Sequence, residues 1–352
     1  MKLQSCMLCE TVQFSANTHL LILNSAADPF VRFARERFQR ADQNGAITLA
    51  EDNIAAVQAL LLQKPPNVTS DRVIRHTAFH NYILHSPEQT MDIAVLNLLY
   101  QPGKAWMLYA LQVALYALRM GGQLYVTGAK DRGVITIGRH IEESFGNVET
   151  LLISKGQRVL RATKTARSSS PAAPSQISSL PAFASNELDE GTQLLLQALD
   201  VHVSDQALDI GCGAGFIGLH IARLATRGHV TMVDASLLAV ATARAAVEKS
   251  QLANVDVLAS DGAKAVIDRR FDLVVTNPPF HQGGAQGLAT GEQFIREAAQ
   301  VLRPTGHFYL VANRFLKYEP TLRAYFTQYT EVGGNTRYKV LRAHLPHEKQ
   351  DD

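Results

Sequence analysis

The feature that most constrains this chain of 352 residues is an internal repeat. The segment 271–277 reads FDLVVTN, and the segment 91–97 reads MDIAVLN. Near the end of each copy, KVLRA at 339–343 corresponds to RVLRA at 158–162. The matches keep one order and a spacing of roughly 180 residues, which indicates the duplication of one α/β domain. A chain of this length is long enough for two such domains.

A segment without apolar periodicity separates the two copies. Residues 163–181 read TKTARSSSPAAPSQISSLP, a composition typical of a linker. We therefore expect a first domain at 1–162, a linker at 163–180 and a second domain at 181–352. Hydrophobic residues make up 46% of the chain and charged residues 19%, so each domain has enough apolar material for its own core.

Strand and helix patterns alternate along the second copy. The strand patterns lie at 207–210, 229–233, 255–259, 271–276 and 307–311, and helix patterns at 216–224 and 237–249. This alternation predicts a mainly parallel sheet flanked by helices on both faces. A hairpin around Gly333-Gly334 would add an antiparallel strand at the edge. The predicted fold class is α/β, with two tandem Rossmann-like domains.

The bulk properties exclude several classes of protein. The apolar run Ala105–Leu118 is shorter than the roughly 18 residues that a membrane span needs, so it predicts a buried helix. No apolar stretch near the start indicates a signal peptide. Cys6 and Cys9 form a C-x-x-C pair without a second pair, so we expect no metal site. Low cysteine usage is typical of a reducing compartment, and we expect a cytoplasmic protein.

The net charge of +2 gives no global attraction to nucleic acid, so any affinity for RNA must come from a local patch. One run of the chain has five basic residues and no acid. These residues are Lys155, Arg158, Arg161, Lys164 and Arg167. The run predicts either phosphate contacts or a solvated strand edge followed by a tether, and the sequence leaves both open.

A glycine-rich turn joins the first strand pattern of the second copy to a helix pattern. Its residues are Asp209, Gly211, Cys212, Gly213 and Gly215. Glycines let the backbone approach a ligand, and the helix start presents free N–H groups. A dinucleotide fingerprint would need glycine where this chain has Phe216. The acid before the glycines suits a ligand with an ammonium group and no phosphate; the alternative is a tight turn without a ligand.

Two further acids follow the next strand patterns. Asp234 lies about 20 residues after the glycine turn, where a carboxylate can accept hydrogen bonds from ribose hydroxyls. Asp261, with Gly262 beside it, is placed to meet the amino group of an adenine, because ligands cross the carboxyl ends of such sheets. Each acid also fits an ordinary role, as a surface residue or a helix N-cap.

The motif Asn277-Pro278-Pro279-Phe280 follows the strand pattern at 271–276. An exocyclic base amine is a poor nucleophile because its lone pair is delocalised into the ring. The side-chain carbonyl of Asn277 and the backbone carbonyl of Pro278 can accept both of its N–H bonds. The prolines stiffen the loop, and Phe280 offers a flat face to an extruded base. The alternative is a Pro-Pro turn with a core phenylalanine.

The glycine turn and the NPPF motif, in this order, resemble the class I methyltransferases that act on amino groups. More closely, the chain resembles the RsmC/RlmG-type ribosomal RNA guanine-N2 methyltransferases. The similar stretches include PAFASNELDEGTQLLLQAL from Pro181, LDIGCGAGFIG from Leu208, NPPFHQG from Asn277 and VANRFLKY from Val311. That family carries a degenerate N-terminal copy of the fold before an active one.

The resemblance implies a cofactor and a role for each motif. S-adenosyl-L-methionine would lie with its methionine end on Asp209 and the glycine turn, its ribose on Asp234 and its adenine on Asp261. The target guanine would lie at 277–280. The first copy reads LLILNSAADPF from Leu20, without glycine, and NLLY in place of NPPF. We expect it to have kept its strands, lost its loops and bound no cofactor.

The predicted reaction is the in-line transfer of a methyl group to guanine N2 in ribosomal RNA, with the small subunit favoured. Positioning and electrostatics would suffice, without a metal or a covalent intermediate. The expected partners are ribosomal RNA or a ribosomal subunit and no membrane, and the expected state is a monomer. His281 follows the motif, but a lone histidine is a weak indication of a general base.

Other functions remain open from the sequence. Adenine-N6 and protein glutamine-N5 methyltransferases also present a planar –NH₂ to such a motif. A non-catalytic RNA-binding ribosome assembly factor is a further alternative, disfavoured by the intact second copy. Phe216 and the Pro-Pro loop argue against a nicotinamide-dependent oxidoreductase.

Overall fold

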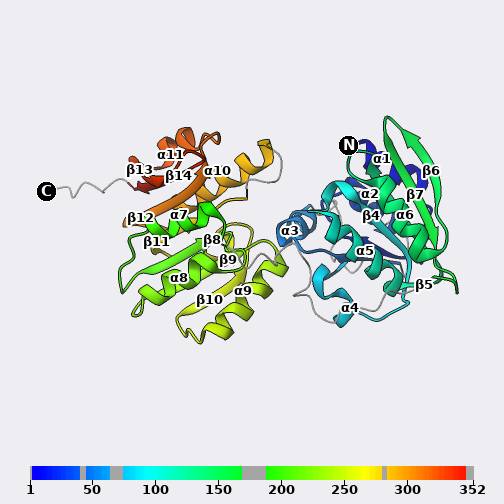
Figure 1. Ribbon diagram of the computed structural model, residues 1–352. Helices are drawn as coiled ribbons and strands as arrows, with labels where there is room; N and C mark the ends of the chain where they lie inside the picture. The colour runs from blue at the N-terminus through cyan, green and yellow to red at the C-terminus, as the bar shows by residue number, and fades with distance from the viewer. Residues whose placement is uncertain (1, 40–44, 64–73, 169–187, 280–283, 346–352) are drawn as a thin grey trace. The chain divides into compact units, whose positions relative to one another are not determined.

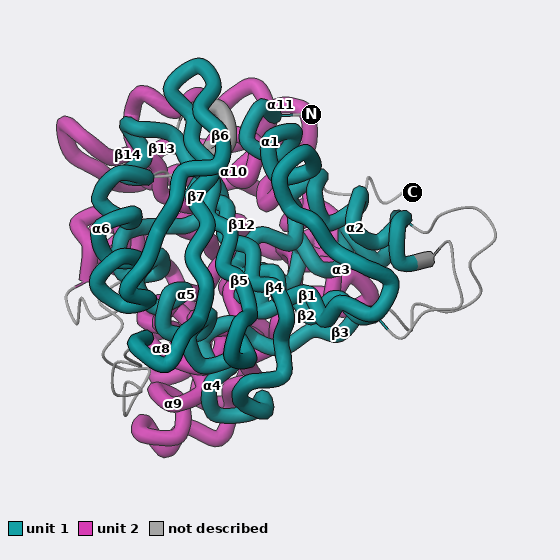
Figure 2. The backbone as a smooth tube through the Cα atoms, turned by 90° about the vertical axis from the view of Figure 1, so that its right-hand side faces the viewer, with its two compact units in different colours: residues 1–184 teal, residues 185–352 magenta. Residues whose placement is uncertain are grey.

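A computed structural model describes residues 2–39, 45–63, 74–168, 188–279 and 284–345. The chain divides into two compact units, unit 1 at residues 1–184 and unit 2 at residues 185–352 (Figures 1 and 2). The expected linker begins at the last residue of a strand, Thr163, and its residues from 169 onward lie outside the described residues.

The described part of unit 1 contains, in chain order, α1 (Leu3–Thr11), β1 (His19–Leu23), α2 (Pro29–Gln39), β2 (Ala46–Ala50), α3 (Ile54–Leu62), β3 (Ile74–Thr77), the 3₁₀ helix η1 (Phe79–Asn81), α4 (Tyr82–His85), β4 (Met91–Asn97), the 3₁₀ helix η2 (Leu98–Tyr100), α5 (Lys104–Ala117), β5 (Leu118–Ala129), α6 (Val134–Phe145), β6 (Glu149–Ser154) and β7 (Gln157–Thr163). The described part of unit 2 contains α7 (Glu190–Ala198), β8 (Gln206–Ile210), α8 (Phe216–Leu224), β9 (His229–Asp234), α9 (Leu237–Ser250), β10 (Val255–Ala259), the 3₁₀ helix η4 (Lys264–Val266), β11 (Phe271–Thr276), α10 (Gly284–Val301), β12 (Leu302–Asn313), α11 (Glu319–Tyr325), β13 (Gln328–Gly334) and β14 (Tyr338–His344).

The two units have the same sheet topology. The order is β3-β2-β1-β4-β5-β7-β6 in unit 1 and β10-β9-β8-β11-β12-β14-β13 in unit 2. The first five strands of each sheet pair in parallel, and β7 and β14 run antiparallel to their neighbours. The prediction of two tandem Rossmann-like domains is therefore confirmed, and so is the C-terminal hairpin, formed by β13 and β14.

Alternation along the strands explains why both faces of the unit 2 sheet are covered. Val274 belongs to one core cluster, which includes Phe294 of α10. Its neighbours Leu273 and Val275 belong to a second cluster, which includes Ile221 of α8. Successive side chains of a strand point to opposite faces, so a continuous apolar strand needs a helix layer on each side. Figure 1 shows these helices on the two faces of the sheet.

The apolar run at 105–118 forms the helix α5, whose residues are mostly buried in unit 1. The prediction of a buried helix there is confirmed. Within the part of the chain that the structure describes, no helix combines the length and the apolar character that crossing a membrane requires.

Candidate active site

Two motif-bearing loops leave the unit 2 sheet side by side. The strands β8 and β11 are parallel neighbours, and their ladder ends at the pair Ile210–Thr276. The Thr276 hydroxyl donates a hydrogen bond to the Ile210 carbonyl at 2.7 Å. The glycine turn follows Ile210 and the NPPF motif follows Thr276, so both begin at the carboxyl edge of the sheet. This is the edge where parallel α/β sheets bind ligands.

The glycine turn folds back on the neighbouring strand β9. The N–H groups of Gly211 and Cys212 both donate to the Val233 carbonyl, at 2.8 and 3.0 Å. Gly211, Gly213 and Gly215 have φ of 74°, 55° and 87°, a left-handed backbone that favours glycine. A Cβ built at Gly213 would meet nothing within 4 Å. The turn therefore leaves open space against bare backbone, which fits close approach by a ligand.

Asp209 lies fully buried at the base of this turn. Its Oδ2 accepts the Gly218 N–H at 2.9 Å, while its Oδ1 has no hydrogen-bond partner among the described residues. Burial raises the pKa of Asp209 to about 7; the nearby Asp234 carboxylate also raises it, and the Gly218 hydrogen bond lowers it. A buried acceptor without a partner fits a ligand that brings an N–H donor, as an ammonium group would.

Asp234 ends β9 with its carboxylate held in place. Its Oδ2 accepts the Gly213 N–H at 2.9 Å, and its Oδ1 accepts the Ser236 N–H at 2.8 Å. The side chain stays half-buried beside the glycine turn. Each carboxylate oxygen has more than one lone pair, so these bonds still leave acceptor capacity for hydroxyl groups. The structure thus brings Asp234 and the glycine turn together.

Helix α10 holds the loop that contains Asp261 and Gly262. Asp261 pairs with Lys264 and accepts a hydrogen bond from Gln293 Nε2 at 3.2 Å. Gly262 has a φ of 58°, and a Cβ there would lie 1.9 Å from Glu297 Oε2. No side chain fits between this loop and α10. Gln293 and Glu297 were not among the predicted site residues, because nothing in the local sequence of α10 marks them.

Asn277 contacts the first turn of α7. Its Nδ2 donates to Thr192 Oγ1 at 2.9 Å and lies 3.3 and 3.4 Å from the two carboxylate oxygens of Asp189. Sequence reasoning assigned neither α7 residue a role, although both stand in a stretch that resembles the family. Pro278 is buried and Pro279 is exposed. Phe280 and the neighbouring histidine at 281 lie outside the described residues.

The loop between β1 and α2 in unit 1 follows the same backbone path as the glycine turn of unit 2, although it contains no glycine. Asn24 takes the left-handed conformation, with φ of 46°, at the position of the first glycine. The Ala26 N–H donates to Glu51 Oε2 at 2.7 Å, just as the Gly213 N–H donates to Asp234 Oδ2. The expectation that unit 1 had lost this loop is therefore wrong as regards the path of the backbone. Asn24 tolerates the positive φ that glycine takes in unit 2, and Glu51 supplies the carboxylate acceptor.

Side chains of unit 1 itself fill the space around this loop. The buried Gln101 amide donates to the carbonyls of Asn24 and Asn97, each at 3.1 Å. The Asn97 amide donates to Asp28 Oδ2 at 2.6 Å. All of these side chains are buried, so the groups that could meet a ligand already have partners in the protein. For this reason we still expect unit 1 to bind no cofactor.

The buried Glu51 makes the stability of unit 1 depend on pH. Burial raises the pKa of Glu51 from 4.5 to about 7. Because the folded pKa is above the unfolded value, stability is full below pH 4.5 and falls as pH rises toward 7, by about 3 kcal/mol. Trp106, the single tryptophan, is buried in unit 1 and reports its unfolding. Denaturant titrations followed by Trp106 fluorescence should show that the free energy of unfolding of wild type falls between pH 4.5 and 7, and that of Glu51→Gln does not. If the free energy of unfolding had the same pH dependence in both proteins, this role of Glu51 would be contradicted.

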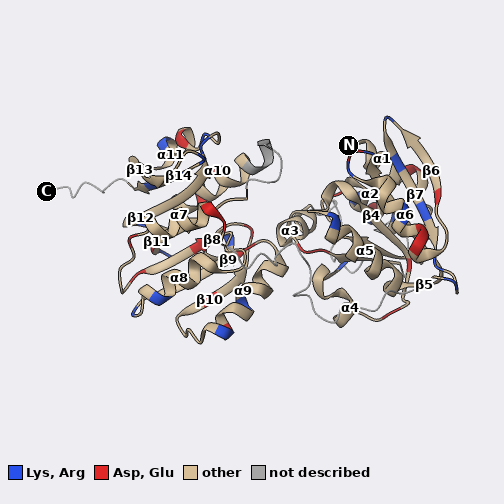
Figure 3. Cartoon of the chain, in the orientation of Figure 1, with Lys and Arg blue, Asp and Glu red and all other residues tan. Residues whose placement is uncertain are grey.

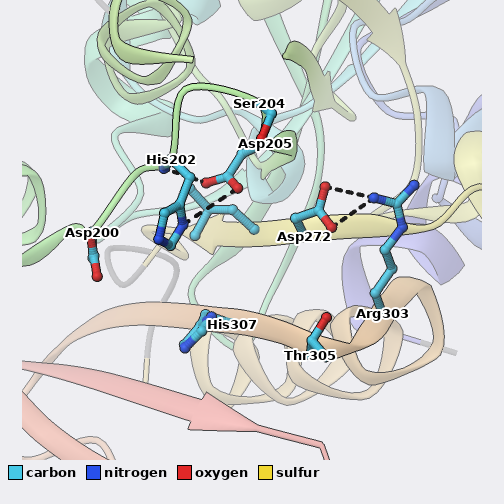
Figure 4. Close-up of a pocket in the computed structure, with 9 residues that line it drawn as sticks. Asp200, His202, Ser204, Asp205, Asp272, Arg303, Thr305 and His307 are labelled. Carbon is cyan, nitrogen blue, oxygen red and sulfur yellow. Dashed lines mark hydrogen bonds and ion pairs between the residues drawn. The ribbon is translucent and has the colours of Figure 1, made fainter. Parts of the chain in front are cut away.

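A cavity of about 440 Å³ lies at the opposite, amino edge of the unit 2 sheet (Figure 4). It is lined by Asp200, His202, Ser204, Asp205, Asp272, Leu273, Arg303, Thr305 and His307. Asp272 accepts the Gln206 N–H at 2.9 Å and pairs with Arg303 at 2.7 Å. Its repeat counterpart Asp92 likewise accepts the first N–H of β1 and pairs with Arg119 at 2.5 Å. The pair recurs in both units, so it belongs to the fold, and the cavity is remote from the predicted site.

The basic run at 155–167 does not form one surface. Arg158 and Arg161 are three residues apart on β7, so their side chains point to opposite faces of the sheet. Arg161 pairs with Glu149, and Lys164 Nζ donates to two carbonyls at the end of α5. Burial also lowers the pKa of Lys164. Figure 3 shows acidic residues among the basic ones on the β6–β7 side of unit 1. Of the two interpretations of this run, a solvated strand edge is therefore favoured over a set of phosphate contacts.

Cys6 and Cys9 lie on α1, and both are free thiols. Burial raises the pKa of Cys9 to about 11, which disfavours the thiolate that would bind a metal. Within the described ranges, no group of three or more His, Cys, Asp or Glu side chains is placed to hold a metal ion.

Comparison with known proteins gives a family and several relatives. The family model of the methyltransferase small domain matches residues 176–342. The ribosomal RNA small subunit methyltransferase C of Erwinia tasmaniensis is 31% identical over 281 residues, which are 77% of this chain and 81% of the relative. The protein of the same name from Hahella chejuensis is 39% identical over 169 residues, 48% of this chain and 49% of the relative. The latter match therefore spans about half of the relative's length.

A solved structure resembles the chain across both units. It is the 16S rRNA N2 methyltransferase RsmC of T. thermophilus, in complex with AdoMet and guanosine. The TM-score is 0.79 at 27% sequence identity, and the likeness covers 97% of this chain and 92% of that one.

Proposed function

Because this chain belongs to the family of the ribosomal RNA small subunit methyltransferase C proteins, we propose that it methylates the exocyclic N2 amine of a guanine in small-subunit ribosomal RNA. The observation that carries the proposal is the adjacency of the glycine turn and the NPPF motif at one sheet edge, joined by the Thr276–Ile210 hydrogen bond. The solved relative, which holds AdoMet and guanosine, supports guanine over adenine N6 or a protein glutamine amide.

We propose S-adenosylmethionine as the cofactor, since the residues present fit it. Asp209 Oδ1, which has no hydrogen-bond partner among the described residues, suits its ammonium group, and the open space at Gly213 suits its approach to the backbone. Asp234 would accept its ribose hydroxyls, and Asp261 would meet its adenine. When bound, the cofactor supplies a methyl group already activated by a sulfonium.

The protein's own part in the reaction is to hold the target amine. Asn277 Oδ1 and the Pro278 carbonyl would accept the two N–H bonds of N2, which favours a pyramidal nitrogen with a localised lone pair. With the amine held in this way, the N2 lone pair would point toward the methyl group that the cofactor supplies, and the proton that N2 loses would pass to solvent. Positioning and preorganised electrostatic support are the two contributions that such a site can make to the rate. We further propose a monomeric enzyme in the cytoplasm, where ribosomal RNA is available.

Labelled cofactor tests this function directly. The protein is incubated with radiolabelled S-adenosylmethionine and with separated small-subunit RNA, large-subunit RNA or assembled subunits. We expect label in the small-subunit RNA, recovered after digestion as N2-methylguanosine. Label found only in large-subunit RNA, in adenine or in protein would contradict the proposal, and the comparison of RNA with particles identifies the natural substrate.

The loop after β12 offers an exposed ring close to the proposed site. Phe315 is 70% exposed, and Lys317 beside it is also exposed. Since β12 is the parallel neighbour of β11, this loop leaves the same sheet edge as Asn277. Base–aromatic stacking contributes about 1–3 kcal/mol, so Phe315→Ala should raise KM for RNA about tenfold with little change in kcat. Leu224→Ala is the control, because Leu224 is an exposed apolar residue at the last position of α8, away from this sheet edge. If Phe315→Ala and wild type had equal KM values for RNA, this contact would be excluded.

A further inference from the structure

Two side chains at the start of α7, one of them its N-cap, hold the amide of Asn277. Thr192 Oγ1 accepts a hydrogen bond from Asn277 Nδ2 at 2.9 Å, and the Asp189 carboxylate lies 3.3 Å from the same nitrogen. Thr192 is only 6% exposed, and Asp189 is the N-cap of the helix. These contacts join segments that are 85 residues or more apart in the chain.

The direction of the hydrogen bonds fixes which atom of the amide faces α7. An ionised carboxylate only accepts, and the Thr192 hydroxyl donates its single proton to Asp189 Oδ2 at 2.9 Å. Toward Asn277 the hydroxyl therefore presents only lone pairs, which must meet a donor. The amide –NH₂ faces α7, and Oδ1 faces away from it. Among the residues that the structure describes, none donates a hydrogen bond to Asn277 Oδ1.

The repeat shows what happens to this oxygen without the prolines. In unit 1, Asn97 Oδ1 accepts the N–H of Leu99 at 3.0 Å, two residues further along its own loop. This is the local capture that asparagine side chains commonly make. In unit 2 the residue two positions after Asn277 is Pro279, which has no N–H. The two prolines thus remove the backbone donors that would otherwise occupy the asparagine oxygen.

The start of α7 is itself fixed against the C-terminal hairpin. Glu190 accepts hydrogen bonds from Arg337 at 2.9 Å and from Asn335 at 2.8 Å, both in the β13–β14 turn. A Cβ at Gly191 would lie 3.3 Å from the Tyr338 ring. Since the helix start has ion-pair and packing contacts on this side, it provides a fixed reference for the amide that it holds.

We propose that Asp189 and Thr192 are positioning residues that lock Asn277 with its carbonyl oxygen toward the target, and that Pro279 keeps that oxygen unoccupied. The inference rests on the proposed function. With the amide reversed, an N–H would face the N–H groups of the target, and the acceptor would be lost. The locked amide therefore selects a base that presents an amino group, and disfavours one that presents a carbonyl oxygen at the same place.

Thr192→Val is the first test, because it removes the hydroxyl and keeps the shape. We expect kcat for RNA methylation to fall about tenfold, with the cofactor Kd and the KM for RNA within about twofold of wild type. Thr192→Ser restores the hydroxyl and should recover most of the rate. Thr242→Val is the matched control and should keep full activity, because the Thr242 hydroxyl donates to the Leu238 carbonyl within its own helix, α9.

A double-mutant cycle separates positioning from a general structural role. In an Asn277→Ala background, Thr192→Val should cause no further loss, because the amide that it positions is gone. Additive losses would overturn the inference, and so would a weaker cofactor Kd with unchanged kcat, which would place Thr192 on the cofactor. Should Thr192→Val fail to fold, Asp189→Asn is the alternative variant, because asparagine still caps the helix. This change frees the Thr192 hydroxyl to donate its proton toward Asn277, so kcat should again fall.

Pro279→Ala tests the other half of the inference. It restores a backbone N–H two residues after Asn277, so the oxygen can be captured locally and kcat should fall about tenfold. Full activity in both Pro279→Ala and Thr192→Val would overturn the proposal. A wild-type protein that methylates no RNA would instead refute the proposed function, so the two failures are distinguishable.

Discussion

Replacing Asn277 with alanine will slow methyl transfer to RNA about 10²–10³-fold and leave cofactor affinity nearly unchanged. Its side-chain oxygen is the acceptor proposed for the target amine, and removal of one preorganised group of this kind costs roughly 10²–10³-fold in kcat. The glycine turn and Asp234, which would hold the cofactor, make these backbone and carboxylate hydrogen bonds without Asn277. Single-turnover methylation assays and calorimetric titration with S-adenosylmethionine measure the two quantities separately.

The duplicated chain offers a matched control for this variant. Asn97→Ala removes the repeat counterpart of Asn277 from unit 1, and we expect the turnover of folded protein to match wild type. The fluorescence of the buried Trp106 checks that unit 1 of the control remains folded. Methylation by Asn277→Ala at a rate near that of wild type would refute the role assigned to this residue.

Replacing Asp234 with alanine will weaken cofactor binding about 100-fold, since hydrogen bonds to a charged group contribute about 1.5–3 kcal/mol each. The variant loses the proposed bonds to two ribose hydroxyls. It also frees the Gly213 and Ser236 N–H groups, which the carboxylate now holds at 2.9 and 2.8 Å. Calorimetry gives the Kd, and kcat should recover at saturating cofactor.

The control for Asp234→Ala is Glu51→Gln, which alters the counterpart acid in unit 1. Its cofactor Kd should equal that of wild type, because unit 1 is expected to bind none. If Asp234→Ala binds S-adenosylmethionine as tightly as wild type, then Asp234 does not contact the ribose. A weaker Kd in Glu51→Gln would instead indicate a binding role for unit 1.

Much of the unit 2 fold could be predicted because its information is local. The helix α8 and the strands β10 and β11 have the predicted bounds, since short segments rich in apolar residues between turn residues mark these elements. The parallel sheet then places the ends of β8, β9, β10 and β11 at one edge. For this reason the glycine turn and the NPPF motif could be predicted to lie together.

Other features of the site depend on contacts between distant segments. Thr192 meets Asn277 across 85 residues of sequence, and Glu297 lies under Gly262 from another element. No local pattern marks either contact. The basic run, whose role the sequence left open, is decided in the same way: Arg158 and Arg161 are near each other in the sequence but point to two faces of β7, because side chains alternate along a strand.

The sequence by itself determined the duplication, the α/β class and the order of the two motifs, because periodicity and motif spacing are properties of short segments. Only the tertiary structure decided that the –NH₂ end of the Asn277 amide faces the start of α7, and showed that unit 1 keeps the loop path but fills it with its own side chains. Both depend on where hydrogen-bond donors and acceptors from distant segments meet, and a donor's partner is fixed only once the chain has folded.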